Sequence, residues 1–396
     1  MRDGASVVVI GAGVIGLSAA RALAERGVDD VLVVDRNVMG SGGTGRSSGV
    51  VRCHYGIRSL AAMAWRSLPV LAGGVDLLGE DTGYRRTGYL VAVGEANVDA
   101  LLANVAMQHQ LGIDVEQIDH TTAGRLWPQA RFDDVAAFAY EALGGYGDGH
   151  QTALAFASAA RRGGVRLRQH TRVAGVFARR DRTIGVELVD GERIDADQVV
   201  VAAGPWSPAL VAGVGIELPI RSQRAQILLV DPSADELGPV PVLSDLVSLQ
   251  YVRTEGIGSL LVGDSDHSEP EWSDPDRYSD EADDRLLVRS IAKFDHRFPG
   301  LPRAQLRSTY AGCYDVTPDY NPIISATPVD GLWICAGFSG HGYKISPAVG
   351  ELVADLVLTG ESQIPDVDHR DFRLQRFDDD ELLVSAHPYV GAGQMR

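Results

Sequence analysis

The chain of 396 residues has few basic side chains, few cysteines and no long apolar run. Its 36 lysines and arginines are outnumbered by 53 aspartates and glutamates, so the formal net charge is −17 at pH 7. Nucleic-acid binding requires clustered positive charge, and we expect no such partner. No segment approaches the ~20 apolar residues of a membrane span, and the apolar run 7–20 lacks the basic leader of a signal peptide. We therefore expect a cytoplasmic protein.

The three cysteines, Cys53, Cys313 and Cys335, are an odd number and lack the spacing of metal ligands. Reduced thiols are therefore expected, rather than a disulfide framework or a metal site. The length predicts two or three domains, and a hydrophobic content of 45% is sufficient for sizeable cores.

A glycine motif near the N-terminus predicts a dinucleotide site. The β-branched run 7–10 reads as a buried strand, residues 17–26 as a helix, and 31–34 as a second strand that ends at Asp35. Between strand and helix lie Gly11, Gly13 and Gly16, which permit a tight turn, close approach of a pyrophosphate, and close helix packing. The helix N-terminus favours the anion, and Asp35 can accept hydrogen bonds from a ribose. This motif alone leaves NAD and FAD open.

Two further segments extend this prediction. Residues 40–49 form a glycine- and serine-rich loop that no packed helix would tolerate, and a second phosphate or ring contact is expected there. A buried strand over 199–201 is followed by a glycine turn, as if it belonged to the first domain. The dinucleotide domain is therefore predicted to be discontinuous.

The remaining segments are predicted from their periodicity and turn residues. Helices are expected at 59–78, 97–110, 121–127, 151–162 and 348–358. Strands are expected at 88–93, 165–168, 173–179, 183–189, 223–230, 246–252 and 259–262. The acidic stretches 231–241 and 264–284 are expected to be surface loops or helix starts, and the polar tail to wrap over the surface.

A block near the C-terminus is the most specific signal in the chain. Residues 314–324 read YDVTPDYNPII and residues 331–344 read GLWICAGFSGHGYK. This block, the AAG-x-W strand and turn at 202–206, and residues 372–377 resemble the D-amino acid oxidase superfamily of FAD-dependent oxidoreductases. The resemblance is to the branch of sarcosine oxidase and dimethylglycine dehydrogenase and covers nearly the whole chain.

The resemblance implies an α/β fold, with a discontinuous Rossmann-like FAD-binding domain and a substrate domain built on an antiparallel β-sheet. We expect the FAD domain at 1–83, 141–217 and 304–370, the substrate domain at 84–140 and 218–303, and a C-terminal tail at 371–396. The expected FAD-binding residues are Gly11, Gly13, Val14, Ile15, Gly16, Asp35, Arg36, Arg46, Ser47, Ser48, Val173, Ala203, Gly204, Trp206, Gly337, Ser339, Gly340, His341, Gly342, Tyr343 and Lys344.

Four side chains are expected to act on the substrate, by alignment with the family. Arg52 and Lys344 would hold a substrate carboxylate, because arginine can bind it through two hydrogen bonds and lysine supplies a point charge. An interdomain ion pair is the alternative for Arg52. Tyr314 and Tyr251 would form aromatic walls around the amine nitrogen, although Tyr251 could equally be a core residue of its strand.

Two departures from the family pattern matter. Monomeric sarcosine oxidases link the flavin to a cysteine at the position of Gly312, whereas here Cys313 lies one residue later, on the other face of an extended segment. Noncovalent FAD is therefore predicted. The lysine that promotes reaction with oxygen aligns with Leu261, and a nearby histidine with Ser265, which favours a dehydrogenase or a slow oxidase.

The resemblance implies oxidation of a secondary or tertiary amine, most plausibly an N-methyl or cyclic amino acid, by hydride transfer to flavin N5 and hydrolysis of the imine. One alternative is deamination of a primary D-amino acid or glycine. Another is a flavin-carrying subunit of a larger oxidase. Oxygen or another electron acceptor would complete the reaction, and a homo-oligomer or a heteromeric complex is possible on this reading.

Overall fold

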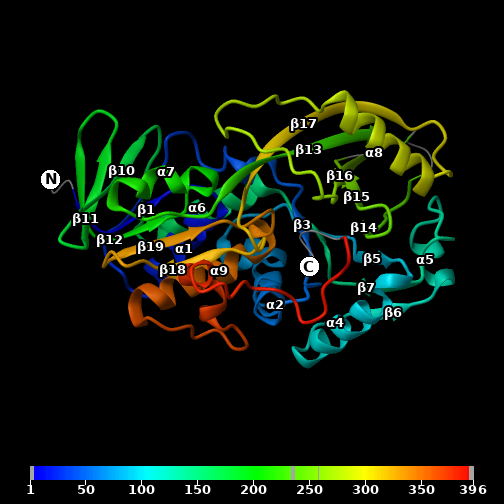
Figure 1. The fold of residues 1–396 in the computed structure, drawn as a ribbon, viewed down its shortest axis with the longest axis horizontal. Coiled ribbons are helices and arrows are strands. Elements are labelled where there is room, and N and C mark those ends of the chain that lie inside the picture. Colours follow the sequence, from blue (N-terminus) through cyan, green and yellow to red (C-terminus); the bar gives the residue numbers. More distant parts are fainter. Residues whose placement is uncertain (1–3, 233–236, 257, 392–396) are drawn as a thin grey trace.

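The computed structural model describes residues 4–232, 237–256 and 258–391. Parts of the segments 1–83, 231–241 and 371–396, for which expectations were stated, lie outside these residues. Two large sheets stand beside each other, one on each side of the molecule (Figure 1).

The first sheet runs in the order β10-β11-β12-β1-β2-β9, with β19 on β12 and β18 on β19. Strands β12, β1, β2, β9 and β19 are parallel where they pair, whereas β10-β11, β11-β12 and β18-β19 are antiparallel. Its strands are β1 (Gly4–Ile10), β2 (Val31–Val34), β9 (Arg166–Arg168), β10 (Val173–Arg179), β11 (Arg182–Leu188), β12 (Arg193–Val201), β18 (Ile323–Ala326) and β19 (Leu332–Ala336).

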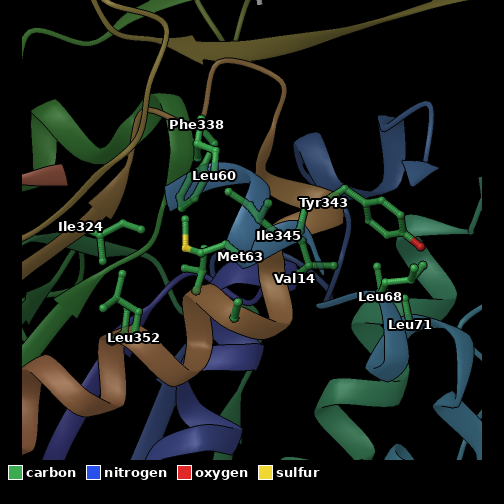
Figure 2. Packing of buried hydrophobic residues seen from close by; sticks show 14 of the residues in the cluster. Val14, Leu60, Met63, Leu68, Leu71, Ile324, Phe338, Tyr343, Ile345 and Leu352 are labelled. Atoms are coloured by element: carbon green, nitrogen blue, oxygen red, sulfur yellow. The ribbon is translucent and has the colours of Figure 1, made fainter. Parts of the chain in front are cut away.

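Both faces of this sheet are covered, because the residues from Val7 to Ile10 of β1 are buried without a break. Val7 and Val9 pack into a core with the helices α1 (Val14–Glu25), α2 (Arg58–Ala72), α6 (Gly149–Arg162) and α9 (Gly342–Thr359). Figure 2 shows side chains from α2, α9 and β18 in this core, among them Met63, Leu352 and Ile324. Val8 and Ile10 pack on the other face with α7 (Ser207–Val211).

The second sheet runs in the order β17-β13-β16-β15-β14-β5-β7-β6 and is antiparallel except at β14-β5. Two long neighbours, β13 and β17, arch across one end of it (Figure 1). Its strands are β5 (Tyr89–Val93), β6 (Glu116–Ile118), β7 (Ala137–Glu141), β13 (Arg221–Asp231), β14 (Val242–Asp245), β15 (Gln250–Glu255), β16 (Ser259–Asp264) and β17 (Gln305–Val316).

Short elements join the two sheets. Strands β3 (Val50–Val51), β8 (Gly145–Tyr146) and β4 (Arg85–Arg86) form a small third sheet. The remaining helices are α3 (Gly74–Leu78), α4 (Val98–Gln110), α5 (His120–Leu126) and α8 (Asp284–Arg297). None of the helices in the described ranges is both long and apolar enough to cross a membrane.

The predicted α/β class and the pairing of a mixed parallel sheet with an antiparallel sheet are confirmed. Two local predictions were wrong. Only residues 250–252 of the strand expected at 246–252 are strand, in β15, because the Asp245 carboxylate accepts hydrogen bonds from the amides of Val247 and Ser248 and holds a turn between β14 and β15. The helix expected at 59–78 divides at Gly73 into α2 and α3.

Two features of the C-terminal half differ from the predicted division into two domains and a surface tail. Strand β17 pairs with β13 in the antiparallel sheet, although its residues fall within the predicted FAD segment 304–370. The tail does not merely wrap the surface, since Phe372, Arg376 and Tyr389 are buried. The domain boundaries themselves stay a prediction.

Candidate active site

The glycine turn after β1 opens a long cleft at the carboxyl end of the parallel strands. Gly11 has φ +111°, and a Cβ there would lie 2.4 Å from the carbonyl oxygen of Ala202. A Cβ on Gly13 would lie 2.9 Å from Oγ1 of Thr44. No Cβ therefore covers the backbone where the first turn of α1 presents its amides. This is the arrangement that a pyrophosphate requires.

The cleft has a volume of about 360 Å³ and collects most of the residues expected to bind the cofactor. Those that line it are Gly11, Gly13, Val14, Ile15, Asp35, Arg36, Ser47, Ser48, Val173, Ala203, Gly204, Trp206, Gly340, Gly342 and Tyr343, together with Tyr314. Those outside its lining are Gly16, Arg46, Gly337, Ser339, His341 and Lys344, as well as Arg52 and Tyr251.

Three of the residues outside the lining, Gly16, Gly337 and Ser339, hold the backbone that surrounds the cleft. A Cβ on Gly16 would lie 2.0 Å from the carbonyl oxygen of Gly11, so this glycine allows the helix to approach the turn. The amide of Gly337 donates to the Asp315 carboxylate over 2.6 Å, and the amide of Ser339 donates to the Asp315 carbonyl. Burial raises the pKa of Asp315 to about 6. These contacts fix the turn that leads into α9.

Asp35 lies at the end of β2, as the motif predicts. One carboxylate oxygen accepts from the Ala12 amide over 2.7 Å and the other from the Asn37 amide over 2.7 Å. The carboxylate is thus held rigidly at the wall of the cleft, where it can also accept from a ribose hydroxyl. Thr44, which the sequence reasoning missed, accepts from the Val14 amide and caps α1.

The loop that follows the antiparallel strand β16 contacts residues of the cleft wall. We call residues 265–283, between β16 and α8, the strap. Its Asp276 pairs with Arg36 over 2.8 Å and accepts from Nε1 of Trp206 over 3.0 Å, while Arg36 stacks 4.1 Å over the Trp206 ring. Its Asp280 pairs with Arg46 over 2.6 Å, so Arg46 binds the strap rather than lining the cleft.

Arg52, Lys344 and His341 form a buried cationic group beside the cleft. Arg52 and Lys344 are each 6% exposed, and neither forms an ion pair with a carboxylate in the described part of the chain. Arg52 lies 4.2 Å over the ring of Tyr55 and donates to the His54 carbonyl. Burial and the neighbouring Arg52 lower the pKa of Lys344 well below its ordinary value.

His341 completes this group as a neutral side chain. Burial, with Lys344 and Arg52 adding repulsion, holds its pKa well below the usual range. Its Nδ1 lies 3.3 Å from the hydroxyl of Tyr55, and its Nε2 is buried without a hydrogen-bond partner among the described residues. A buried arginine and a buried lysine that form no ion pair favour an anionic ligand, which would restore the charge of the lysine.

The two predicted tyrosines lie together at the junction of the sheets. Tyr251 on β15 is half-buried over Gly263 and hydrogen-bonds to Ser48 and Tyr314. Tyr314 on β17 lines the cofactor cleft and also a second cavity. The role of Tyr251 stays a prediction. Sequence reasoning missed Gln223 and His267, which lie beside these tyrosines, because both come from segments with the weakest family match.

Cys313 also lines the cleft, with Sγ 3.7 Å from Oγ of Ser273, and a Cβ on the preceding Gly312 would face Arg46. Gly312 and Cys313 thus face different surroundings, as expected for successive residues of a strand. Noncovalent attachment of FAD stays a prediction.

Known proteins match this chain along most of its length. It is 29% identical over 393 residues to 4-methylaminobutanoate oxidase (formaldehyde-forming) of Paenarthrobacter nicotinovorans, and this match covers 93% of the chain but 45% of that protein. It is 26% identical over 389 residues to sarcosine oxidase subunit beta of Rhodobacter capsulatus, covering 95% and 89%. The chain thus spans less than half of the first relative and most of the second.

Among solved structures, L-proline dehydrogenase from P. horikoshii superimposes with a TM-score of 0.87 at 26% identity, covering 96% of this chain and 100% of that one. The family described as FAD dependent oxidoreductase (DAO) matches residues 6–356. With its glycine turn, its carboxylate at the end of β2 and its paired sheets, the chain belongs to this family of FAD-dependent oxidoreductases.

Proposed function

We propose that this protein oxidises a secondary or tertiary amine that carries a carboxylate, namely an N-methyl or cyclic amino acid. The observation that carries the proposal is that the buried side chains of Arg52 and Lys344 form no ion pair with a carboxylate in the described ranges, while Glu141 acts on Arg52 only from beyond ion-pair distance. The similar proteins are named for compounds of this class, which are 4-methylaminobutanoate, sarcosine and L-proline.

The cleft residues fit FAD. The bare turn at Gly11 and Gly13, the first amides of α1 and the carboxylate of Asp35 suit a pyrophosphate and an adenosine ribose. The N-terminal end of α9, at Gly342 and Tyr343, would place amides and a helix dipole beside the flavin, where negative charge develops on reduction. The chemistry supplied by bound FAD is acceptance of a hydride at N5 from the carbon next to the amine nitrogen, after which water hydrolyses the imine.

The chain's own residues have the task of orientation. Arg52 and Lys344 would hold the carboxylate, which would raise the pKa of Lys344 again by neutralising the charge around it. Tyr251 and Tyr314 would enclose the amine end, because Tyr314 lines the cofactor cleft and Tyr251 hydrogen-bonds to it. A ring face favours a methylated or cationic nitrogen.

A second candidate, deamination of a primary amino acid, is supported by 29% identity to glycine oxidase of Pseudomonas aeruginosa, with 91% of this chain and 96% of that protein covered. The products separate the two candidates. Formaldehyde or a cyclic imine indicates the first, and ammonia with a keto acid the second. If the protein is instead a flavin-carrying subunit of a larger oxidase, its activity should require a partner chain.

We also infer a dehydrogenase or a slow oxidase, with FAD bound noncovalently. Leu261 is buried on β16 directly opposite Arg253, so an apolar side chain occupies the position aligned with the oxygen-promoting lysine. Fast reoxidation of the reduced protein by oxygen in a stopped-flow instrument would contradict this.

The experiment is an anaerobic titration of the purified yellow protein with N-methyl, cyclic and D-amino acids, followed by flavin absorbance. We expect bleaching by a secondary or tertiary amino acid, with an amine that lacks a carboxylate far weaker. Bleaching by primary amino acids alone would favour the second candidate, and absence of bleaching with every amine would refute the proposal for the isolated chain.

A further inference from the structure

A second cavity lies on the antiparallel sheet, beneath the strap and α8. Its volume is about 440 Å³, within the range of small-molecule sites. Gln223, Tyr251, His267 and Tyr314 line it, and Tyr314 also lines the cofactor cleft. The two cavities are therefore neighbours that share one side chain.

Gln223 is the residue of interest in this cavity. It lies on β13 directly opposite Tyr314 on β17 and is 6% exposed. Its Nε2 is 3.4 Å from Nδ1 of His267, whereas its Oε1 is buried and has no hydrogen-bond partner among the described residues. A buried acceptor without a partner is costly and rare in native proteins.

The surroundings do not offer Oε1 another partner. The strap runs along β13, with the Ser273 amide donating to Ser222 and the Arg224 amide donating to Glu271, so the roof is fixed by backbone hydrogen bonds. Charged groups of the cavity wall already pair with each other: Arg224 with Glu271 and Asp283, and Asp264 with Arg289.

The position of Gln223 relative to the cofactor cleft decides which part of a ligand it would meet. Gln223 lines the second cavity and not the cleft, whereas Tyr314, directly opposite it, lines both. On the other side, the ring of His267 packs 5.7 Å from that of Tyr320, and its charge helps to lower the pKa of His341 beside Arg52 and Lys344. A substrate held by Arg52 and Lys344 could thus extend a substituent past His267 into this cavity.

We propose that Gln223 is a specificity-determining residue whose Oε1 accepts a hydrogen bond from a hydroxyl, amide or ammonium group on the substrate's substituent, remote from the reacting carbon. The inference rests on the proposed function, because it uses the carboxylate anchor of that site. It predicts a substrate larger and more polar than an N-methylated glycine. A site built to hydrogen-bond a donor discriminates against ligands without one, since its acceptor is then left unpaired.

The test measures binding of inert carboxylates to the holoenzyme by the perturbation of flavin absorbance. A series of ω-hydroxy acids of increasing length is compared with unsubstituted acids and with ω-oxo acids of the same lengths. At the best length we expect the hydroxy acid to bind about tenfold more tightly than the unsubstituted acid. Gln223→Leu should abolish this preference. Gln226→Leu, three residues further along β13 and bonded to Glu271, should preserve it.

Gln223→Glu keeps a hydrogen-bond acceptor at this position. It therefore tests the inference even if the leucine variant does not fold. It should retain the preference for the hydroxy acid and favour an ω-ammonium acid further. Equal preference in wild type and Gln223→Leu, or tighter binding of the oxo acids, would overturn the inference. Failure of the proposed function looks different: no amine would bleach the flavin, while the Gln223-dependent preference among inert acids would persist.

Discussion

The guanidinium of Arg376 forms two hydrogen bonds to the carboxylate of Asp319, over 2.7 and 3.0 Å, and the side chains of both residues are almost completely buried. Arg376 also donates to the Asn321 carbonyl, and Asp319 accepts from the Leu383 amide. This pair fastens the C-terminal segment to the loop after β17, which leads into the strands beside the cleft.

Removal of one partner of this pair should be strongly destabilising, because the other charge is then buried alone. We expect Arg376→Ala to lower the free energy of unfolding by about 3–5 kcal/mol. Arg373→Ala is the control, since its ion pair with Glu381 is solvent-exposed and should contribute under about 1 kcal/mol. Chemical denaturation of both variants measures the difference, and similar losses would contradict the role given to Arg376.

Lys344→Met should weaken binding of a substrate carboxylate about ten- to a hundredfold, the range for a hydrogen bond to a charged group. Because the effect is on the carboxylate, reduction of the flavin by an amine without one should change little. Arg58→Met alters an exposed ion pair with Asp366 and serves as the control. Anaerobic titrations give both affinities, and an equal loss for both kinds of amine would argue against a carboxylate contact.

Gly13→Val should abolish retention of FAD, because its side chain would meet Thr44 and fill the approach to the first turn of α1. Gly124→Ala is the matched control: it lies in α5 with no atom within 4 Å of an added Cβ. We expect the control to keep its yellow colour and to gain about 0.5–1 kcal/mol in stability. Flavin content per protein after gel filtration is the measurement. Retention of FAD by the valine variant would contradict the site.

Glu141 should make stability depend on pH. Burial raises its pKa to about 7, against the pull of the Cys53 amide and of Arg52. Since the folded-state pKa lies above the unfolded value, the folded protein favours the protonated acid, and this residue's contribution to stability falls as pH rises from about 4.5 to about 7. Glu141→Gln should therefore stabilise the protein at pH 8 relative to wild type and change little at pH 4.5. Denaturation across this range tests the sign.

FAD should be released when the holoprotein is precipitated with acid. The reason is that the position of the family's flavin-linked cysteine is Gly312, which faces Arg46. Absorbance of the supernatant and the pellet gives the distribution. A yellow pellet that persists in Cys313→Ser would point to attachment through another residue, whereas one that disappears in this variant would implicate Cys313.

The elements predicted correctly from the sequence are those whose residues follow one another closely in the chain. The stretch from β1 through α1 to Asp35 was predicted because a strand, a glycine turn and a helix follow each other without a break. Gln223 and His267 could not be found in this way. They come together with Tyr314 through pairing of β13 with β17 and through the strap, over separations of 44 residues and more.

The strand expected at 246–252 shows a related limit. Its apolar residues satisfy the pattern of a strand, but the carboxylate of Asp245, fixed by the buried Arg297 from α8, reaches the amides that follow and forces a turn. A distant charged partner thus decided a local conformation. Arg52 and Lys344 lie almost 300 positions apart, so no local pattern could group them. Only the alignment with the family predicted that they act together.

The interleaving of the two sheets has a consequence for the order of events on the ribosome. Strand β1 is made before β12 and β19, which extend the same sheet and begin at residues 193 and 332. Contacts of such long range form slowly. The turn at Gly11 is likewise synthesised long before α9 and Lys344. The nascent protein would therefore acquire its flavin only after α9 has been made.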